Sequence, residues 1–151
     1  MRRYLLSAVL AVAAAACGGD DGTGPTGSLN VEGTWSASVS NLSGGGASCH
    51  TSTPVQVTIR QTGSTFTGSY SGGILTCLTP TESFSSALGS GNVTNGQLAG
   101  TTVTFDLGSP DFHHSGTVNG TSMSGTAAWN YDFGPPLDDV MLAGSWSATR
   151  Q

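Results

Sequence analysis

The sequence predicts an all-β protein: an eight-stranded antiparallel up-and-down β-barrel that follows a signal peptide and a flexible tether. Composition is the first reason, because 23 glycines and many Ser and Thr residues leave few that favour a helix. The second reason is the alternation of apolar and polar residues along short segments. The third is a pair of similar segments, 33–38 and 144–150, which we interpret as the first and last strands of one closed sheet.

Residues 1–16 are predicted to be a signal peptide. Two arginines precede an apolar run that is too short to span a membrane and that ends in small residues. Segment 14–17, Ala-Ala-Ala-Cys, resembles the lipobox of bacterial lipoproteins, and the resemblance implies that Cys17 carries fatty acids such as palmitate and anchors the chain to the outer membrane of the cell envelope. The alternative is plain secretion, with Cys17 as a spare or disulfide-forming cysteine.

Residues 17–31 are predicted to form a Gly- and Asp-rich tether, and residues 32–151 the barrel domain. After Cys17 the tether has no aromatic and few apolar residues, so it cannot repay the entropy of ordering. Beyond the signal peptide only Arg60 and Arg150 oppose the nine carboxylates of the chain. This acidic balance argues against a nucleic-acid partner.

The predicted strands are defined by alternation and separated by turn signals. They cover residues 33–40, 54–61, 64–71, 83–99, 102–107, 111–118, 122–131 and 140–150. In the first three strands one face carries Trp35, Ala37, Val39, Val55, Val57, Ile59, Phe66 and Tyr70. This period of two is typical of a half-buried strand, and a tight turn at Thr62-Gly63 joins the second strand to the third.

The later strands follow the same rule. Their inward positions hold Val103, Phe105, Leu107, Phe112, His114, Val118, Met123, Ala127, Trp129, Tyr131, Val140, Leu142, Trp146 and Ala148. We expect the long fourth strand to bend at Gly89, Gly91 and Asn95-Gly96, because such residues mark bulges. Asn119-Gly120 is the strongest hairpin signal in the chain.

The connections are predicted to alternate between tight and long. The expected long ones are 41–53, 72–82, 108–110 and 132–139. Because alternate connections of an up-and-down barrel fall at opposite ends, one end should be closed by tight turns and the other should be a mouth built of loops. The interior of an eight-stranded barrel is either filled by side chains or holds one small ligand.

Two pairs of residues are expected to meet in this topology. Cys49 and Cys77 fall in the first two long loops, so a disulfide is predicted at the mouth, as an exported protein permits. At the closed end the guanidinium of Arg150 is predicted to lie over the indole of Trp35. Trp146, on the same face as Arg150, is assigned with this pair to barrel closure.

Gly33-Thr34-Trp35 on the first strand, together with Arg150 on the last, resembles the Gly-x-Trp motif and terminal Arg of the lipocalins and their avidin-like relatives, the calycin group. The resemblance implies a barrel able to hold a small apolar molecule. It identifies no particular ligand.

The leading functional hypothesis is a binding module for a small apolar molecule or a peptide. Its candidate lining residues are Trp129, Tyr131, Phe105, Phe66 and Tyr70. The alternative is a structural or protein-interaction role in the envelope, including a protease-inhibitor-like role, with a solid barrel core. In either case we expect a monomer and no cofactor.

Enzymatic and metal-dependent functions are not favoured. No Gly-x-Ser-x-Gly nucleophile elbow follows a strand, and the serines are too numerous for one near a histidine to be informative. Candidate metal ligands are His114, Asp111, Asp138 and Asp139. A polar strand start with solvated loop acids explains these residues better. His113 and His114 are adjacent on one strand and must point to opposite faces.

Overall fold

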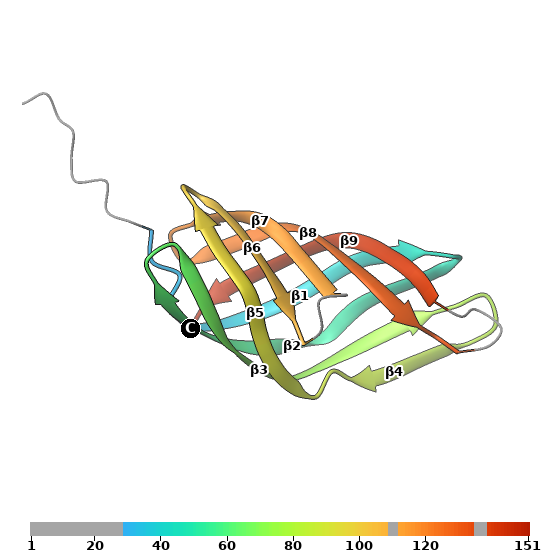
Figure 1. The fold of residues 1–151 in the computed structure, drawn as a ribbon. Coiled ribbons are helices and arrows are strands. Elements are labelled where there is room, and N and C mark those ends of the chain that lie inside the picture. Colours follow the sequence, from blue (N-terminus) through green and yellow to red (C-terminus); the bar gives the residue numbers. More distant parts are fainter. Residues whose placement is uncertain (1–28, 109–111, 135–138) are drawn as a thin grey trace, which may run out of the picture.

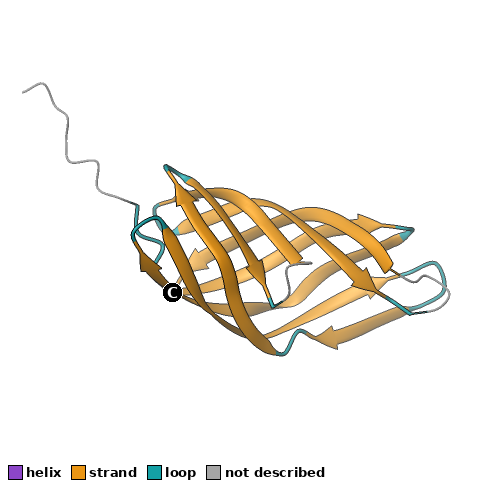
Figure 2. Ribbon diagram, in the orientation of Figure 1, coloured by secondary structure: helices purple, strands orange, loops and turns teal. Residues whose placement is uncertain are grey.

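The computed structural model describes residues 29–108, 112–134 and 139–151. This part of the chain forms nine antiparallel strands, whose arrangement is drawn in Figure 1. They are β1 (Gly33–Gly44), β2 (Ala47–Thr62), β3 (Thr65–Leu78), β4 (Ser83–Ala87), β5 (Ser90–Ala99), β6 (Thr102–Leu107), β7 (Phe112–Asn119), β8 (Ser122–Asp132) and β9 (Asp139–Arg150). Between them the described residues form turns and loops but no helix (Figure 2). It follows that no described segment is a helix long and apolar enough to cross a membrane.

The sheet closes on itself, which confirms the predicted barrel. Its order is β2-β1-β9-β8-β7-β6-β5-β3, and pairing of β2 with β3 completes the ring. The first and last strands are neighbours, with Trp35 opposite Arg150 and Ala37 opposite Ala148. The closed ring of the barrel therefore contains eight strands, as the alternation of the sequence predicts.

The ninth strand is part of the bent fourth strand that the sequence predicts. β4 and β5 pair in succession with the same edge of β3, β4 with its second half and β5 with its first half. They are separated at Leu88-Gly89, where Gly89 has a φ of 71°. A second irregularity falls at Asn95-Gly96, where the register between β5 and β6 shifts and Asn95 has a φ of 53°.

The first three strands are longer than predicted. As a result, the prediction of long loops at 41–53 and 72–82 is wrong. Segment 41–53 is a hairpin whose turn is Gly45-Gly46, with φ values of 56° and 84°. Such a two-residue turn needs positive φ, which glycine supplies without steric cost. In segment 72–82, β3 continues to Leu78 and turns within four residues into β4. These stretches contain clusters of Gly and several Ser residues, and cross-strand pairing overrides the low β-propensity of glycine.

The two ends of the barrel differ as the alternation requires (Figure 1). We call the end that carries the β2–β3, β5–β6 and β7–β8 turns the closed end; the described start of the chain and its C-terminus lie there. The other end, the mouth, carries the β1–β2 hairpin, the β3–β4 turn and the β8–β9 connection.

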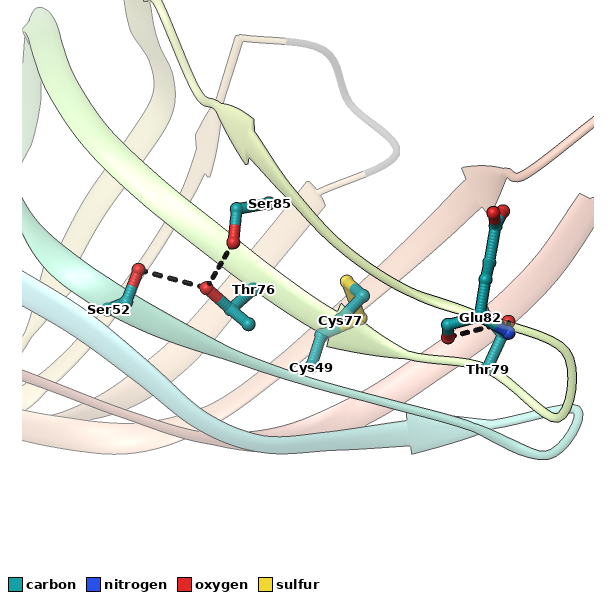
Figure 3. The surroundings of a disulfide bond; sticks show 7 residues. All are labelled: Cys49, Ser52, Thr76, Cys77, Thr79, Glu82 and Ser85. Carbon is teal, nitrogen blue, oxygen red and sulfur yellow. Dashed lines mark hydrogen bonds between the residues drawn. A yellow bond between two sulfur atoms is a disulfide. The ribbon is translucent and has the colours of Figure 1, made fainter.

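A disulfide joins Cys49 to Cys77 on the mouth side of the barrel (Figure 3). The two cysteines are direct cross-strand partners in β2 and β3, with Cα atoms 4.1 Å apart, rather than members of two loops. Nearby on the same strands, Thr76 Oγ1 donates to Ser52 Oγ at 3.0 Å and lies 2.9 Å from Ser85 Oγ of β4. The disulfide and these hydroxyls tie β2, β3 and β4 together.

Candidate functional site

The closed end is tightly sealed by Trp35 and Arg150. Trp35 is fully buried, its Nε1 donates to the carbonyl of Val31 at 2.8 Å, and Arg150 Cζ lies 4.6 Å from the ring centroid. The Arg150 guanidinium also donates to the carbonyls of Asn30 and Glu32. The start of the domain therefore folds across this end and covers the first strand.

The interior on the mouth side is hollow, with a cavity of about 420 Å³. Its walls are Ala37, Ser38, Val39, Thr51, Val55, Tyr70, Leu75, Ser86, Ala87, Leu88, Phe105, Leu107, Gly108, Phe112, His114, Trp129, Tyr131 and Trp146. Every strand except β5 contributes at least one of these residues. They range from the middle of the barrel, at Ala37, Tyr70 and Trp146, to the end of the strands nearer the mouth. The cavity is thus an inner chamber of the barrel.

Four of the five predicted lining residues border the cavity: Phe105, Tyr70, Trp129 and Tyr131. Phe66 does not. Its side chain is buried nearer the closed end, with its ring centroid 6.0 Å from that of Phe105. Trp146, which the sequence analysis assigned to barrel closure, borders the cavity instead, and its Nε1 donates to the carbonyl of Ser115 at 3.0 Å.

Aromatic rings form the cavity wall contributed by β6, β7 and β9. The imidazole of His114 stacks on Phe105 with a centroid distance of 4.8 Å and an interplanar angle of 4°. The indole of Trp146 stands edge-on to both rings, at 5.2 Å from Phe105 and 5.6 Å from His114. Phe112 meets the imidazole from another side at 4.4 Å. These contacts hold His114 in one place.

A second aromatic row leads from the cavity toward the mouth. Trp129 stacks on Phe112 at 4.4 Å, and Tyr131 and Phe133 follow at alternate positions of the chain, each 4.6 Å from the ring before it. Phe133 in turn contacts Phe84 of β4 at 6.1 Å. Neither Phe84 nor Phe133 was predicted as part of the site, although Phe133 continues the parity of Trp129 and Tyr131.

His114 is the polar group most deeply enclosed beside the cavity. It is 2% exposed, and its Nδ1 has no hydrogen-bond partner among the described residues. Desolvation by burial lowers the pKa of His114 from 6.5 to about 4, and the charge of His113 acts in the same direction. The backbone of Phe112 and the carboxylate of Asp106 oppose this pKa shift. The imidazole is therefore neutral at pH 7.

The residues considered as metal ligands do not come together in the part of the barrel that can be described. His114 faces the interior and Asp139 is exposed at the start of β9, while Asp111 and Asp138 lie outside the described residues. Across the described ranges, no group of three or more His, Cys, Asp or Glu side chains is arranged to hold a metal ion.

A polar cluster on the outer wall was not predicted. Asp106 is 5% exposed; it accepts a hydrogen bond from Asn95 Nδ2 at 2.7 Å, and one of its oxygens lies 2.7 Å from Nδ1 of His113. The bulge at Asn95 places its amide over the carboxylate. The cluster satisfies a buried charge on the face of the wall opposite the cavity, and it orients the half-exposed His113.

Comparisons with protein-family models, with curated proteins and with solved structures found no match to this chain.

Proposed function

We propose that the protein binds a small, predominantly apolar molecule inside the barrel. The observation that carries this proposal is the cavity of about 420 Å³, walled by the rings of Phe105, Phe112, Trp129, Tyr131 and Trp146. Its volume falls within the range of small-molecule sites, which are concave and mostly apolar with a few placed polar groups. Here those groups are the side chains of Tyr70, Tyr131 and His114.

The cavity also bears on the competing proposal of a structural or interaction protein with a solid core. Packing such a core would need a larger side chain at Ala37, a small residue on the inner face of β1 that borders the cavity. The small side chain at this inward position leaves space beside the aromatic walls. This favours the binding module over the solid barrel.

The test is binding of the neutral fluorophore N-phenyl-1-naphthylamine, whose emission rises in apolar surroundings. We expect saturable binding to the purified protein with one site per chain. Ala37→Phe places a ring in the cavity and should weaken binding at least tenfold. Ala143→Phe is the matched control, because Ala143 is exposed on β9. Equal binding by both variants would show that the fluorophore lies elsewhere and would refute the proposed site.

We further propose that the chain is exported and anchored by lipid at Cys17, because segment 14–17 resembles a relaxed form of the bacterial lipobox. The Cys49–Cys77 disulfide fits an oxidising compartment. The described chain starts at the closed end, so a tether there would leave the mouth directed away from the membrane. Cys17→Ser should release the protein from membranes into the soluble fraction; retention of this variant on membranes would refute the anchor.

A further inference from the structure

We infer that the ligand of the cavity is an uncharged aromatic molecule bearing a hydroxyl group, and that His114 is the residue that recognises this hydroxyl. The inference rests on the proposed function and names the class of ligand. Three observations on the described residues carry it: an imidazole nitrogen that has no partner among them, a cavity wall to which they contribute no charged side chain, and six aromatic rings besides His114 in that wall.

The position of His114 is costly for an empty barrel. Inward positions on β7 are otherwise apolar, with Phe112 and Val118 buried on either side. A buried nitrogen without a hydrogen bond has lost its contacts with water and gained no partner in exchange, which destabilises the fold. Such groups are rare in folded proteins. Because the imidazole borders the cavity, a molecule held there can provide the missing partner.

A hydroxyl suits this imidazole better than other polar groups. A neutral imidazole has one N–H donor and one acceptor nitrogen, and a hydroxyl can both donate and accept, so it satisfies either tautomer. A half-turn of the ring about χ2 exchanges Nδ1 with Cδ2 while the ring stays in its slot between Phe105 and Phe112. Either edge of the imidazole can therefore present a nitrogen to the ligand.

The cavity excludes ionised ligands. Its described lining residues include no Asp, Glu, Lys or Arg. An ionised group transferred from water into such surroundings, without a partner of opposite charge, loses far more hydration than it regains. A carboxylate on the same aromatic skeleton should thus bind much more weakly than the neutral alcohol. The aromatic side chains in the wall favour a ring system over a flexible chain.

The experiment compares 2-naphthol, 2-methylnaphthalene and 2-naphthoate as competitors of bound N-phenyl-1-naphthylamine. The first two differ by a hydroxyl against a methyl group of similar size. The measured quantity is the dissociation constant of 2-methylnaphthalene divided by that of 2-naphthol. We expect this ratio to be about tenfold higher for the unmodified protein than for His114→Phe, because only the unmodified protein offers naphthol a hydrogen bond to a buried partner. Naphthoate should compete at least tenfold more weakly than naphthol.

Two further variants make the result decisive. His50→Phe is the matched control, because His50 is exposed on β2, and it should leave the ratio unchanged. His114→Leu replaces the imidazole with a smaller apolar group, in case phenylalanine disturbs the fold. If neither variant folds, the unmodified protein decides: naphthol should bind at least as tightly as the more apolar methyl compound.

The outcomes separate the two proposals. An unchanged ratio in the His114 variants, with the fluorophore still displaced by both compounds, would mean that a water or no group at all meets the imidazole; the ligand class would be wrong and the binding cavity would stand. Tight competition by naphthoate would likewise overturn the ligand class. Fluorophore binding that is insensitive to Ala37→Phe would overturn the cavity itself.

Discussion

The closed end and the mouth half of this barrel are made from the same strands but differ in how their interiors are packed. At the closed end, large side chains fill the interior and the polar atoms of Trp35 and Arg150 are paired with backbone carbonyls. In the mouth half, aromatic rings border a cavity, and Nδ1 of His114 has no hydrogen-bond partner within the described part of the chain. The first arrangement stabilises the fold, and the second keeps space for a ligand at some cost in stability.

The largest effect should follow truncation at the closed end. Trp35→Ala removes a fully buried indole together with its hydrogen bond to Val31, and should lower the free energy of unfolding by roughly 3–5 kcal/mol. Thr34→Ala, at an exposed neighbouring position, is the control. Urea denaturation measures both, and an unchanged midpoint for Trp35→Ala would contradict the idea that this end carries the stability.

The disulfide should contribute nearly as much on the mouth side. It closes a loop with a sequence separation of 28, so its loss should cost about 3–4 kcal/mol in the chain-entropy account. The double variant Cys49→Ala with Cys77→Ala avoids the free thiols that reduction would leave. Thermal unfolding compares it with the parent protein. A difference below about 1 kcal/mol would mean that the hairpin of β2 and β3 is already held by its hydrogen bonds.

The pH dependence of stability should report on His114. Because its pKa falls from 6.5 to about 4 on folding, the unfolded chain binds more protons in that interval. Stability is therefore fully present above pH 6.5 and is lost as the pH falls toward 4, by roughly 3 kcal/mol at most. His114→Phe should remove this part of the pH dependence. Denaturation of both proteins at pH 7, 5.5 and 4.5 tests it; parallel curves would show that His114 is not enclosed.

The smallest effects give the sharpest comparison, since Ala37 and Ala148 are cross-strand partners on the inner face. Ala37 borders the cavity, whereas Ala148 is buried outside it. Ala148→Phe should destabilise by about 1–3 kcal/mol through overpacking, and Ala37→Phe by less than about 1 kcal/mol because its ring enters free space. Equal losses in chemical denaturation would mean that the space beside Ala37 cannot accept the added ring.

Much of the fold is predictable because the strands alternate apolar and polar residues over most of their length. Even the bend of the fourth strand is visible in Gly89 and in Asn95-Gly96. The ends of the first three strands could not be predicted in this way. Gly44-Gly45-Gly46, for example, is typical of a loop, and the residues on either side of it become strand only because β1 pairs with β2 and β9.

The candidate site is predictable in part, for a related reason. Parity identifies which residues face inward, including Trp129, Tyr131 and Phe105. It does not show which inward residues pack against each other and which leave a space. Phe66 and Trp146 both face inward, yet only Trp146 borders the cavity. The difference lies in their positions along the barrel axis, which depend on how the strands are registered against each other.

The short strand β4 has a consequence for motion. In the described part of the chain it pairs with β3 alone, so its second edge contributes no ladder hydrogen bonds. Opening β4 therefore breaks one set of hydrogen bonds and leaves the eight-membered ring of strands closed. Its amides should exchange with deuterium sooner than those of β1 or β9, which are paired on both sides. Since Ser86 and Ala87 border the cavity, such a local opening would expose the interior without unfolding the barrel.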